Sequence, residues 1–375
     1  MVSVLGDHFA DIPDPRRAQG RRHLLSDMIV IAVTAVICAA DSWADVRAFG
    51  VAKLKWFQTF LPLRHGIPSA DTFERVFSRL DPDAFERCFT KWTQALSVRS
   101  AGQLVAIDGK RIRRSFEHAW SQSSAAHLVS AFVTDNGTVF AQVALEENEN
   151  EIKGIPRLLE LLDLRGATVT IDAIGCQTAI AERIVAQGGD YVLCVKDNQP
   201  QLAQALRADL DDLIRMKFTG VAHDVWETTD GDHGRIETRR VWTTSRMDWL
   251  GNEQARWSGL RSVAVVESTR EVSPQGVSHE RRYYISTLDG TDAKRVAGAI
   301  RGHWGIENKL HYVLDVSFAE DQSRIRKGHA AENFSRIRRI ALNLLRRETT
   351  KKRGIKGKRL IAGWDHDYLL KLLSG

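Results

Sequence analysis

Three acidic residues have the type and the placement needed to hold metal ions. Asp108 ends the apolar stretch 104–108, and Asp172 ends a second one at 167–172. Short apolar runs of this kind predict buried strands, and reactive groups in α/β sheets gather at the carboxyl ends of strands. Glu307 lies in RGHWGIENKLHYVLDV (301–316), where apolar residues recur at helical spacing. Carboxylate oxygens suit Mg²⁺ and Mn²⁺, so the three residues could form a metal site that acts on a polyanion.

Each acidic residue also has an ordinary structural interpretation. An Asp at the end of a strand is most often a turn residue, and a Glu beside basic residues on a helix is usually part of a solvated salt-bridge face. His303, Glu307 and His311 recur every four residues and therefore form one polar row on the helix. Zinc-binding helices favour His-Glu-x-x-His, with the histidines one turn apart, and this row does not match that pattern.

The elements around Asp108 and Asp172 alternate between strands and helices. Residues 127–145 predict two strands joined by Asp135-Asn136-Gly137, a hairpin turn signal. Three further segments have strand patterns: 104–110, 167–172 and 190–199, the last of which ends in Lys196, Asp197, Asn198 and Gln199. Two segments between them have helical patterns: about 151–163 and 176–187. This alternation predicts a mixed α/β sheet.

Changes of pattern along the chain predict its division into segments. Ser69 or Asp71 can cap one helix of an α-helical N-terminal module, and Asp81 with Pro82 can begin the next. The predicted segments are the helical module 1–95, the first part of the core 100–200, a β-rich insertion 201–290, the second part of the core with Glu307 at 291–348, and a basic C-terminal tail of weaker pattern at 349–375.

Composition places the chain among globular proteins with an anionic partner. The net charge is +6, but from Glu320 to Leu360 there are 14 Lys or Arg against 4 Asp or Glu, a local net of +10 that leaves the rest at −4. Such a basic segment predicts binding to a polyanion. The four cysteines form no CxxC pair, which suits the reducing cytoplasm. The apolar run 28–40 is too short to cross a bilayer and predicts a buried helix.

Several longer motifs resemble those of a known protein family. They are GIPSADTFERVFSRL, AIDGKRIRRS, TIDAIGCQ, GGDYVLCVKDNQ, DHGRIETR and RGHWGIENKLHYVLDVSFAEDQSRIRKGHAAENFSRIRRIALNLL. With the acidic triad, these motifs resemble a DDE-type insertion-sequence transposase, in particular the H-repeat-associated proteins found with Rhs elements. The resemblance extends from about residue 5 to residue 348.

This resemblance implies a fold, an activity and partners. The fold is α/β: a ribonuclease H-like catalytic core, interrupted by the β-rich insertion, with the α-helical N-terminal module. Asp108, Asp172 and Glu307 would be catalytic and would hold two Mg²⁺ ions, with Mn²⁺ as a substitute, Asp108 bridging both. Water would attack at the element's ends, and the freed 3′-OH would then attack target DNA. The implied partners are double-stranded DNA, namely terminal inverted repeats and target, and a second copy of the chain; the implied location is the cytoplasm, on the nucleoid.

Related transposases have a Tyr-Arg-Glu-Lys pattern around the catalytic Glu, and this chain departs from it. The Tyr, Arg and Lys positions hold Ile300, His303 and Leu314. We therefore expect Arg301, His303 and Lys309 to supply the terminal-phosphate contacts. Trp304 is expected in the core.

Further DNA contacts are expected beside the acidic residues and after them. The residues beside the site are Lys110, Arg113, Arg114, Asn198 and Gln199. Those further along are Arg324, Arg326, Lys327 and the basic face of 336–347, which would follow the DNA backbone. The basic residues also fit solvated surfaces.

Two other functions remain open from the sequence. One is a domesticated DNA-binding protein that retains only the scaffold, and the other is a nuclease of the same fold without strand transfer. The intact acidic triad favours the transposase.

Overall fold

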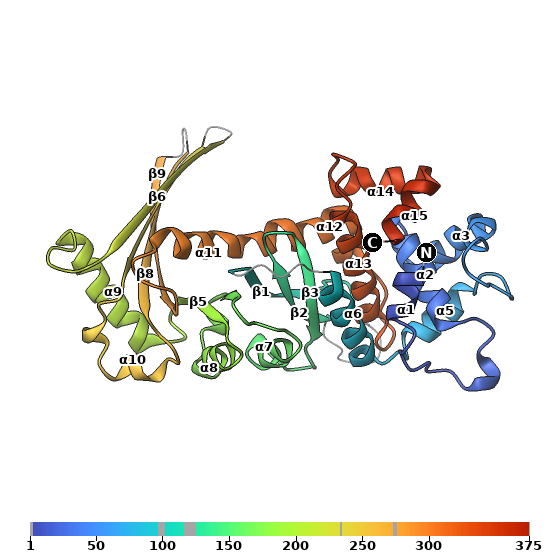
Figure 1. The fold of residues 1–375 in the computed structure, drawn as a ribbon, viewed down its shortest axis with the longest axis horizontal. Coiled ribbons are helices and arrows are strands. Elements are labelled where there is room, and N and C mark those ends of the chain that lie inside the picture. The colour runs from blue at the N-terminus through green and yellow to red at the C-terminus, as the bar shows by residue number, and fades with distance from the viewer. Residues whose placement is uncertain (1–2, 97–101, 116–124, 233–234, 273–275, 375) are drawn as a thin grey trace. The chain divides into compact units, whose positions relative to one another are not determined.

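The computed structural model describes residues 3–96, 102–115, 125–232, 235–272 and 276–374 (Figure 1). His233 and Gly234 of the motif DHGRIETR lie outside these residues. The chain divides into two compact units, each built from separated segments. The first unit comprises Met1–Arg99, Gly109–Asn150 and Glu307–Gly375, and the second comprises Ser100–Asp108 and Glu151–Ile306.

A nine-stranded mixed sheet has the strand order β3-β2-β1-β4-β5-β9-β8-β7-β6. The strands of the predicted core are β1 (Leu104–Arg111), β2 (His127–Val133), β3 (Thr138–Ala144), β4 (Thr168–Ile171) and β5 (Asp190–Val195). β1, β4 and β5 run parallel to one another, whereas β2 and β3 form an antiparallel hairpin. The predicted strands and the mixed α/β class are therefore confirmed, except that β5 ends at Val195, before the predicted end at residue 199.

The first unit contains the helices of the N-terminal module. They are α1 (Ser3–His8), α2 (Leu25–Ile37), α3 (Trp43–Ala52), α4 (Leu54–Phe57), α5 (Ala70–Phe77) and α6 (Pro82–Leu96). α2 is buried along nearly its whole length, as its apolar run predicts. Ser69 caps α5 by accepting the Thr72 amide at 3.2 Å, and Asp81 accepts the Asp83 amide at 3.0 Å at the start of α6. Both predicted helix starts are confirmed.

α13 (Ala330–Arg347) packs against α2 and α6 and is buried on almost every side. Its Arg336, Arg338 and Arg339 are at most 1% exposed. Arg336 donates to Glu86, and Arg339 pairs with the fully buried Glu320 at 3.1 Å. The prediction that this face follows DNA is wrong for these three arginines, because buried carboxylates supplied by other segments pair with two of them directly.

The C-terminal segment differs from the expected tail of weak pattern. It forms α14 (Ile355–Trp364) and α15 (His366–Leu373). Lys358 donates to the Leu345 carbonyl at 2.9 Å, and Arg359 donates to the Val36 carbonyl at 2.8 Å. These carbonyls lie in the last turns of α13 and α2, where no intrahelical donor remains. Two of the tail's cations therefore stabilise helix ends instead of facing solvent.

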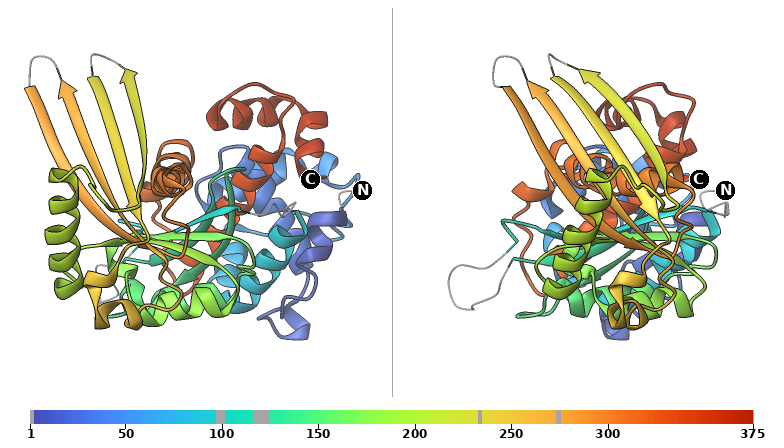
Figure 2. Two further views of the ribbon diagram at one scale, coloured as in Figure 1. Left: turned by 60° about the vertical axis from the view of Figure 1, so that its left-hand side comes forward. Right: turned by 90° about the vertical axis from the view of Figure 1, so that its left-hand side faces the viewer.

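The second unit contains α7 (Glu151–Glu160), α8 (Thr178–Ala186), α9 (Pro200–Arg215), α10 (Asn252–Arg256) and α11 (Ala293–Gly305). The strands of its predicted β-rich region are β6 (Asp224–Asp232), β7 (Arg235–Thr244), β8 (Ser262–Val272) and β9 (Gly276–Ser286). β9 pairs with β5, so the predicted β-rich region continues the same sheet. Figure 2 shows β6 to β9 extending beyond α9 and α11. Cross-strand pairs such as Glu267–Arg281, 2.6 Å apart, stabilise these exposed strands.

Within the described residues, no helix combines the length and the apolar character needed to cross a membrane.

Asp27 on α2 provides a test of pH-dependent stability. Its side chain is 6% exposed, and burial raises the pKa of its carboxyl to about 6, although the Leu63 amide donates to it. The folded state therefore holds this proton more tightly than the unfolded chain, so this carboxyl lowers stability as pH rises from about 4 to 6. We expect Asp27→Asn to increase the free energy of unfolding at pH 7 by up to about 3 kcal/mol, and to change it little at pH 3.5. Urea unfolding at both pH values measures this, and equal effects at the two would contradict the assignment.

Candidate active site

Strand register places Asp108 and Asp172 side by side. β1 and β4 pair in parallel from Leu104↔Thr168 to Ile107↔Ile171, and the two Asp residues follow the last of these pairs. Asp172 has an exposed side chain, and Asp108 is partly exposed. Because the preceding residues on both strands are buried apolar ones, the carboxylates lie where the core meets solvent.

His303 on α11 contacts the end of β4. Its Nδ1 lies 3.2 Å from the Thr170 hydroxyl, and its Nε2 lies 4.0 Å from Asp172 Oδ1. α11 packs across β4 and β5, which brings His303 to this edge of the sheet. Its predicted contact with a terminal phosphate stays a prediction.

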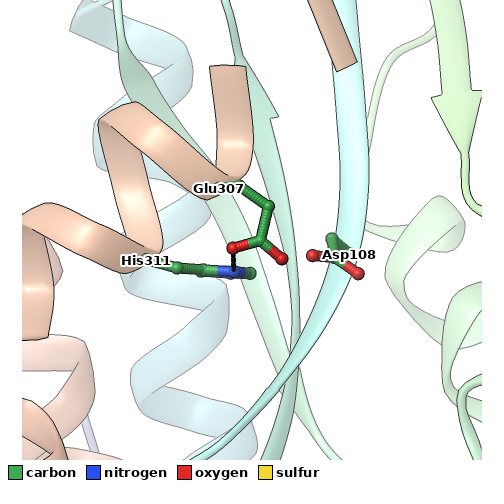
Figure 3. Close-up of side chains that lie close together, drawn as sticks. All are labelled: Asp108, Glu307 and His311. Carbon is green, nitrogen blue, oxygen red and sulfur yellow. Dashed lines mark ion pairs between the residues drawn. The ribbon is translucent and has the colours of Figure 1, made fainter. Parts of the chain in front are cut away.

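Glu307 lies in a π-helical turn, Ile306–His311, that directly follows α11 and continues into α12 (Tyr312–Phe318). Its side chain is exposed, and one carboxylate oxygen lies 3.5 Å from His311 Nδ1 (Figure 3). Ile306 and Leu310 in the same turn are fully buried and fix the backbone. π-turns within α-helices occur frequently at functional sites.

Trp304 is exposed, and the expectation that it lies in the core is wrong. Half of its surface is accessible, and the Arg282 guanidinium lies 5.5 Å from its ring centroid. The helix directs its neighbour Ile306 inward instead, because only one side of this helix faces the apolar core.

The cations that follow Asp108 are engaged within the first unit. Lys110 Nζ donates to both carboxylate oxygens of Asp315 at 2.6 and 2.7 Å. Arg113 Nε lies 3.2 Å from Asp321, and the Arg114 carbonyl accepts from Arg326 at 3.0 Å.

Asn198 and Gln199 hold the loop that follows Asp172. The Asn198 amide donates to the Ala173 carbonyl at 2.7 Å, and the Gln199 amide donates to the Cys176 carbonyl at 3.0 Å. Their side-chain donors therefore support a neighbouring loop, and their predicted contact with DNA is untested.

The other predicted DNA contacts lie on several elements. Arg301 pairs with Asp230 at 2.8 Å, Lys309 donates to the Thr134 carbonyl at 3.3 Å, and Lys327 lies 3.9 Å from Glu74. Arg324 is exposed. The sequence motifs assigned no role to His311 or Asp315, although both follow Glu307 at intervals of four, a signal that could have identified them.

Comparison with known proteins gives the family. Residues 99–344 match the family described as "Transposase DDE domain", and residues 6–93 match one described as "DDE_Tnp_1-associated". The chain belongs to the DDE transposases. The family predicted from the sequence motifs is confirmed.

Curated relatives assign this transposase to the H-repeat family. "H repeat-associated putative transposase YhhI" of Escherichia coli K12 is 37% identical over 377 residues, which cover 100% of this chain and 98% of that protein. "Putative transposase YncI" of Escherichia coli O157:H7 is 41% identical, covering 100% of this chain and 95% of that protein. A solved structure described as a piggyBac transposase synaptic complex with hairpin DNA is 10% identical, with a TM-score of 0.42 over 100% of this chain and 77% of that one; this likeness is too low to support an argument.

The Asn198 contacts predict a local role in the transposase. We expect Asn198→Ala to speed amide hydrogen exchange in residues 172–177, since the loop loses the side-chain donor to its Ala173 carbonyl. Asp197→Ala is the matched control, because the Asp197 side chain is 97% exposed. Unchanged exchange combined with weaker DNA binding would instead make Asn198 a DNA contact.

Proposed function

We propose that this transposase cleaves DNA at the ends of an insertion sequence and joins the freed 3′-OH to target DNA. Asp108, Asp172 and Glu307 carry the chemistry in this proposal. The observation that supports it best is the register of β1 and β4, which sets two carboxylates side by side at the carboxyl ends of parallel strands. His303, which contacts Asp172, lies one helical turn before Glu307.

We assign the core to the ribonuclease H-like fold. The order β3-β2-β1-β4-β5, with a β2–β3 hairpin and parallel β1, β4 and β5, supports this assignment. Along the sequence, β6 to β9 follow α9 and precede α11, so the insertion comes before the helix that leads to Glu307.

The donor set fits a hard divalent cation. In the second unit, Asp108 and the exposed Asp172 offer carboxylates at the ends of neighbouring strands. In the first unit, Glu307 offers a carboxylate beside His311 (Figure 3). The carboxylate oxygens suit Mg²⁺ or Mn²⁺, and few protein ligands are needed when phosphate oxygens and water complete the coordination. Bound metal would activate the attacking hydroxyl and offset charge on the leaving 3′ oxygen. Asp108, Asp172 and Glu307 would hold the metal.

We place contacts with the DNA backbone on cations that remain exposed. Besides the predicted Arg324 and Lys327, the segment before α14 presents Lys352 and Arg353 to solvent, and the first turn of α14 presents Lys356. Such cations bind phosphates without reading sequence, so binding should weaken as salt rises. A homodimer that bridges two element ends stays part of the proposal.

Strand cleavage tests the proposed chemistry. The substrate is DNA with the sequences that flank this gene's element, incubated with Mg²⁺ or Mn²⁺. Asp108→Asn and Glu307→Gln should each lower the cleavage rate by at least about 100-fold, because loss of a metal ligand removes several kcal/mol of transition-state stabilisation. Affinity for the element's ends should remain within about twofold. Asp212→Asn, at an exposed position, is the control.

The same assay separates the transposase from the other two functions. Cleavage followed by joining to a target plasmid supports the transposase. Binding to the ends without cleavage by the wild-type protein would indicate a DNA-binding relic, and cleavage without joining would indicate a nuclease. Equal loss of binding and cleavage in Asp108→Asn would contradict the catalytic role of Asp108.

A further inference from the structure

Three contacts join the segment after Asp108 to the segment after Glu307. Lys110 pairs with Asp315, Arg113 pairs with Asp321, and Arg326 donates to the Arg114 carbonyl. All six residues belong to the first unit, and we call them the clamp. The sequence alone predicted phosphate contacts for four of them, Lys110, Arg113, Arg114 and Arg326.

Lys110 is the centre of the clamp. Its side chain is 10% exposed, and its Nζ lies within 2.7 Å of both Asp315 oxygens and 3.5 Å from Asp321. Two carboxylates thus offset the charge of one largely buried ammonium group. If this ammonium group moved to a phosphate, both carboxylates would lose their ion pair with it. Asp315 is only about one-third exposed, so its charge would be poorly solvated.

The acidic side of the clamp is anchored in the core. Asp321 follows Glu320, which is fully buried and accepts from the Ser335 hydroxyl on α13 at 2.7 Å. Burial by itself would raise the pKa of the Glu320 carboxyl, but Arg339, Arg338 and the Ser335 hydroxyl outweigh it and lower the pKa. Glu320 therefore stays ionised and fixes the short turn Glu320–Gln322 against α13.

The clamp residues share faces with two of the proposed metal ligands. Lys110 lies two residues after Asp108 on β1, so both side chains point to one side of the strand. Asp315 lies eight residues after Glu307, with His311 between them. The Lys110–Asp315 pair therefore ties the strand that presents Asp108 to the helix that follows Glu307.

We propose that Lys110 and Asp315 are positioning residues that set the geometry of the Asp108 and Glu307 carboxylates, and that Lys110 does not bind phosphate. This inference rests on the proposed function, because it takes Asp108 and Glu307 as metal ligands. The Asp315→Asn variant distinguishes a positioning role of Lys110 from a phosphate-binding role. An anionic side chain cannot bind phosphate, so a phosphate-binding Lys110 and its partner would respond oppositely to neutralisation.

The experiment compares Lys110→Met with Asp315→Asn in the full chain. Mn²⁺ binding without DNA is measured from the loss of the free Mn²⁺ signal in electron paramagnetic resonance, and affinity for element-end DNA is measured as a function of salt. Both variants should weaken Mn²⁺ binding by about tenfold, which is the lower end of the range of affinity losses for residues that orient a metal ligand. Both should leave the DNA affinity within about twofold and the salt dependence unchanged. The double variant should bind Mn²⁺ no worse than either single one, since the residues act as a pair.

Two controls keep the result interpretable. Lys110→Arg retains the charge and should keep most of the Mn²⁺ binding. This variant keeps the comparison informative if circular dichroism shows that a neutral variant folds poorly. Lys327→Met removes an exposed cation. It should lower by about one the slope of the logarithm of DNA affinity against the logarithm of salt concentration, without changing Mn²⁺ binding.

Three outcomes would overturn the inference. If Lys110→Met weakens DNA binding and lowers its salt dependence while Asp315→Asn does neither, Lys110 is a phosphate contact. Glu307→Gln tests the proposed metal site separately: unchanged Mn²⁺ binding in that variant would overturn both the site and the clamp's role. Weaker binding in Glu307→Gln with normal binding in Lys110→Met and Asp315→Asn would overturn the clamp alone.

Discussion

The first unit depends on the requirement that a buried charge be paired. α13 places three arginines in the core, where an isolated guanidinium would be strongly destabilising. Glu86 reaches Arg336 from α6, and Glu320 reaches Arg339 from the turn after α12. Each pair fixes one more segment against α13. The turn fixed by Glu320 also presents Asp321 to the cations that follow Asp108, so the buried network supports the surroundings of the proposed site.

The second unit depends on a change of strand direction at β5. On one side β5 pairs in parallel with β4, and on the other it pairs antiparallel with β9. A single sheet can therefore contain both the core strands and the longer strands of the insertion. α11 packs against β4 and β7 alike, so it spans core and insertion strands within this unit before the chain reaches Glu307.

Much of the positive charge serves the fold. The local net charge of +10 between Glu320 and Leu360 suggested a long DNA-binding surface, yet Arg336, Arg338, Arg339, Lys358 and Arg359 are buried in ion pairs or donate to helix carbonyls. Two physical needs, pairing buried carboxylates and satisfying carbonyls at helix ends, account for these cations. The cations left for DNA are fewer and lie on exposed segments such as 351–356.

The sequence by itself determined the family, the core strands β1 to β5, the helix starts at Ser69 and Asp81, and the buried α2. These features depend on local patterns of apolar residues, caps and turns, which act over a few neighbouring residues. Only the tertiary structure decided the partners of the charged side chains: the Lys110–Asp315 pair spans 205 residues and the Arg336–Glu86 pair 250. No local pattern distinguishes a lysine that faces solvent from one that meets a distant carboxylate, because the free energy of each depends on burial and on which segments the fold brings together. For the same reason, the exposure of Trp304 and the contact of His303 with Asp172 became visible only in the fold.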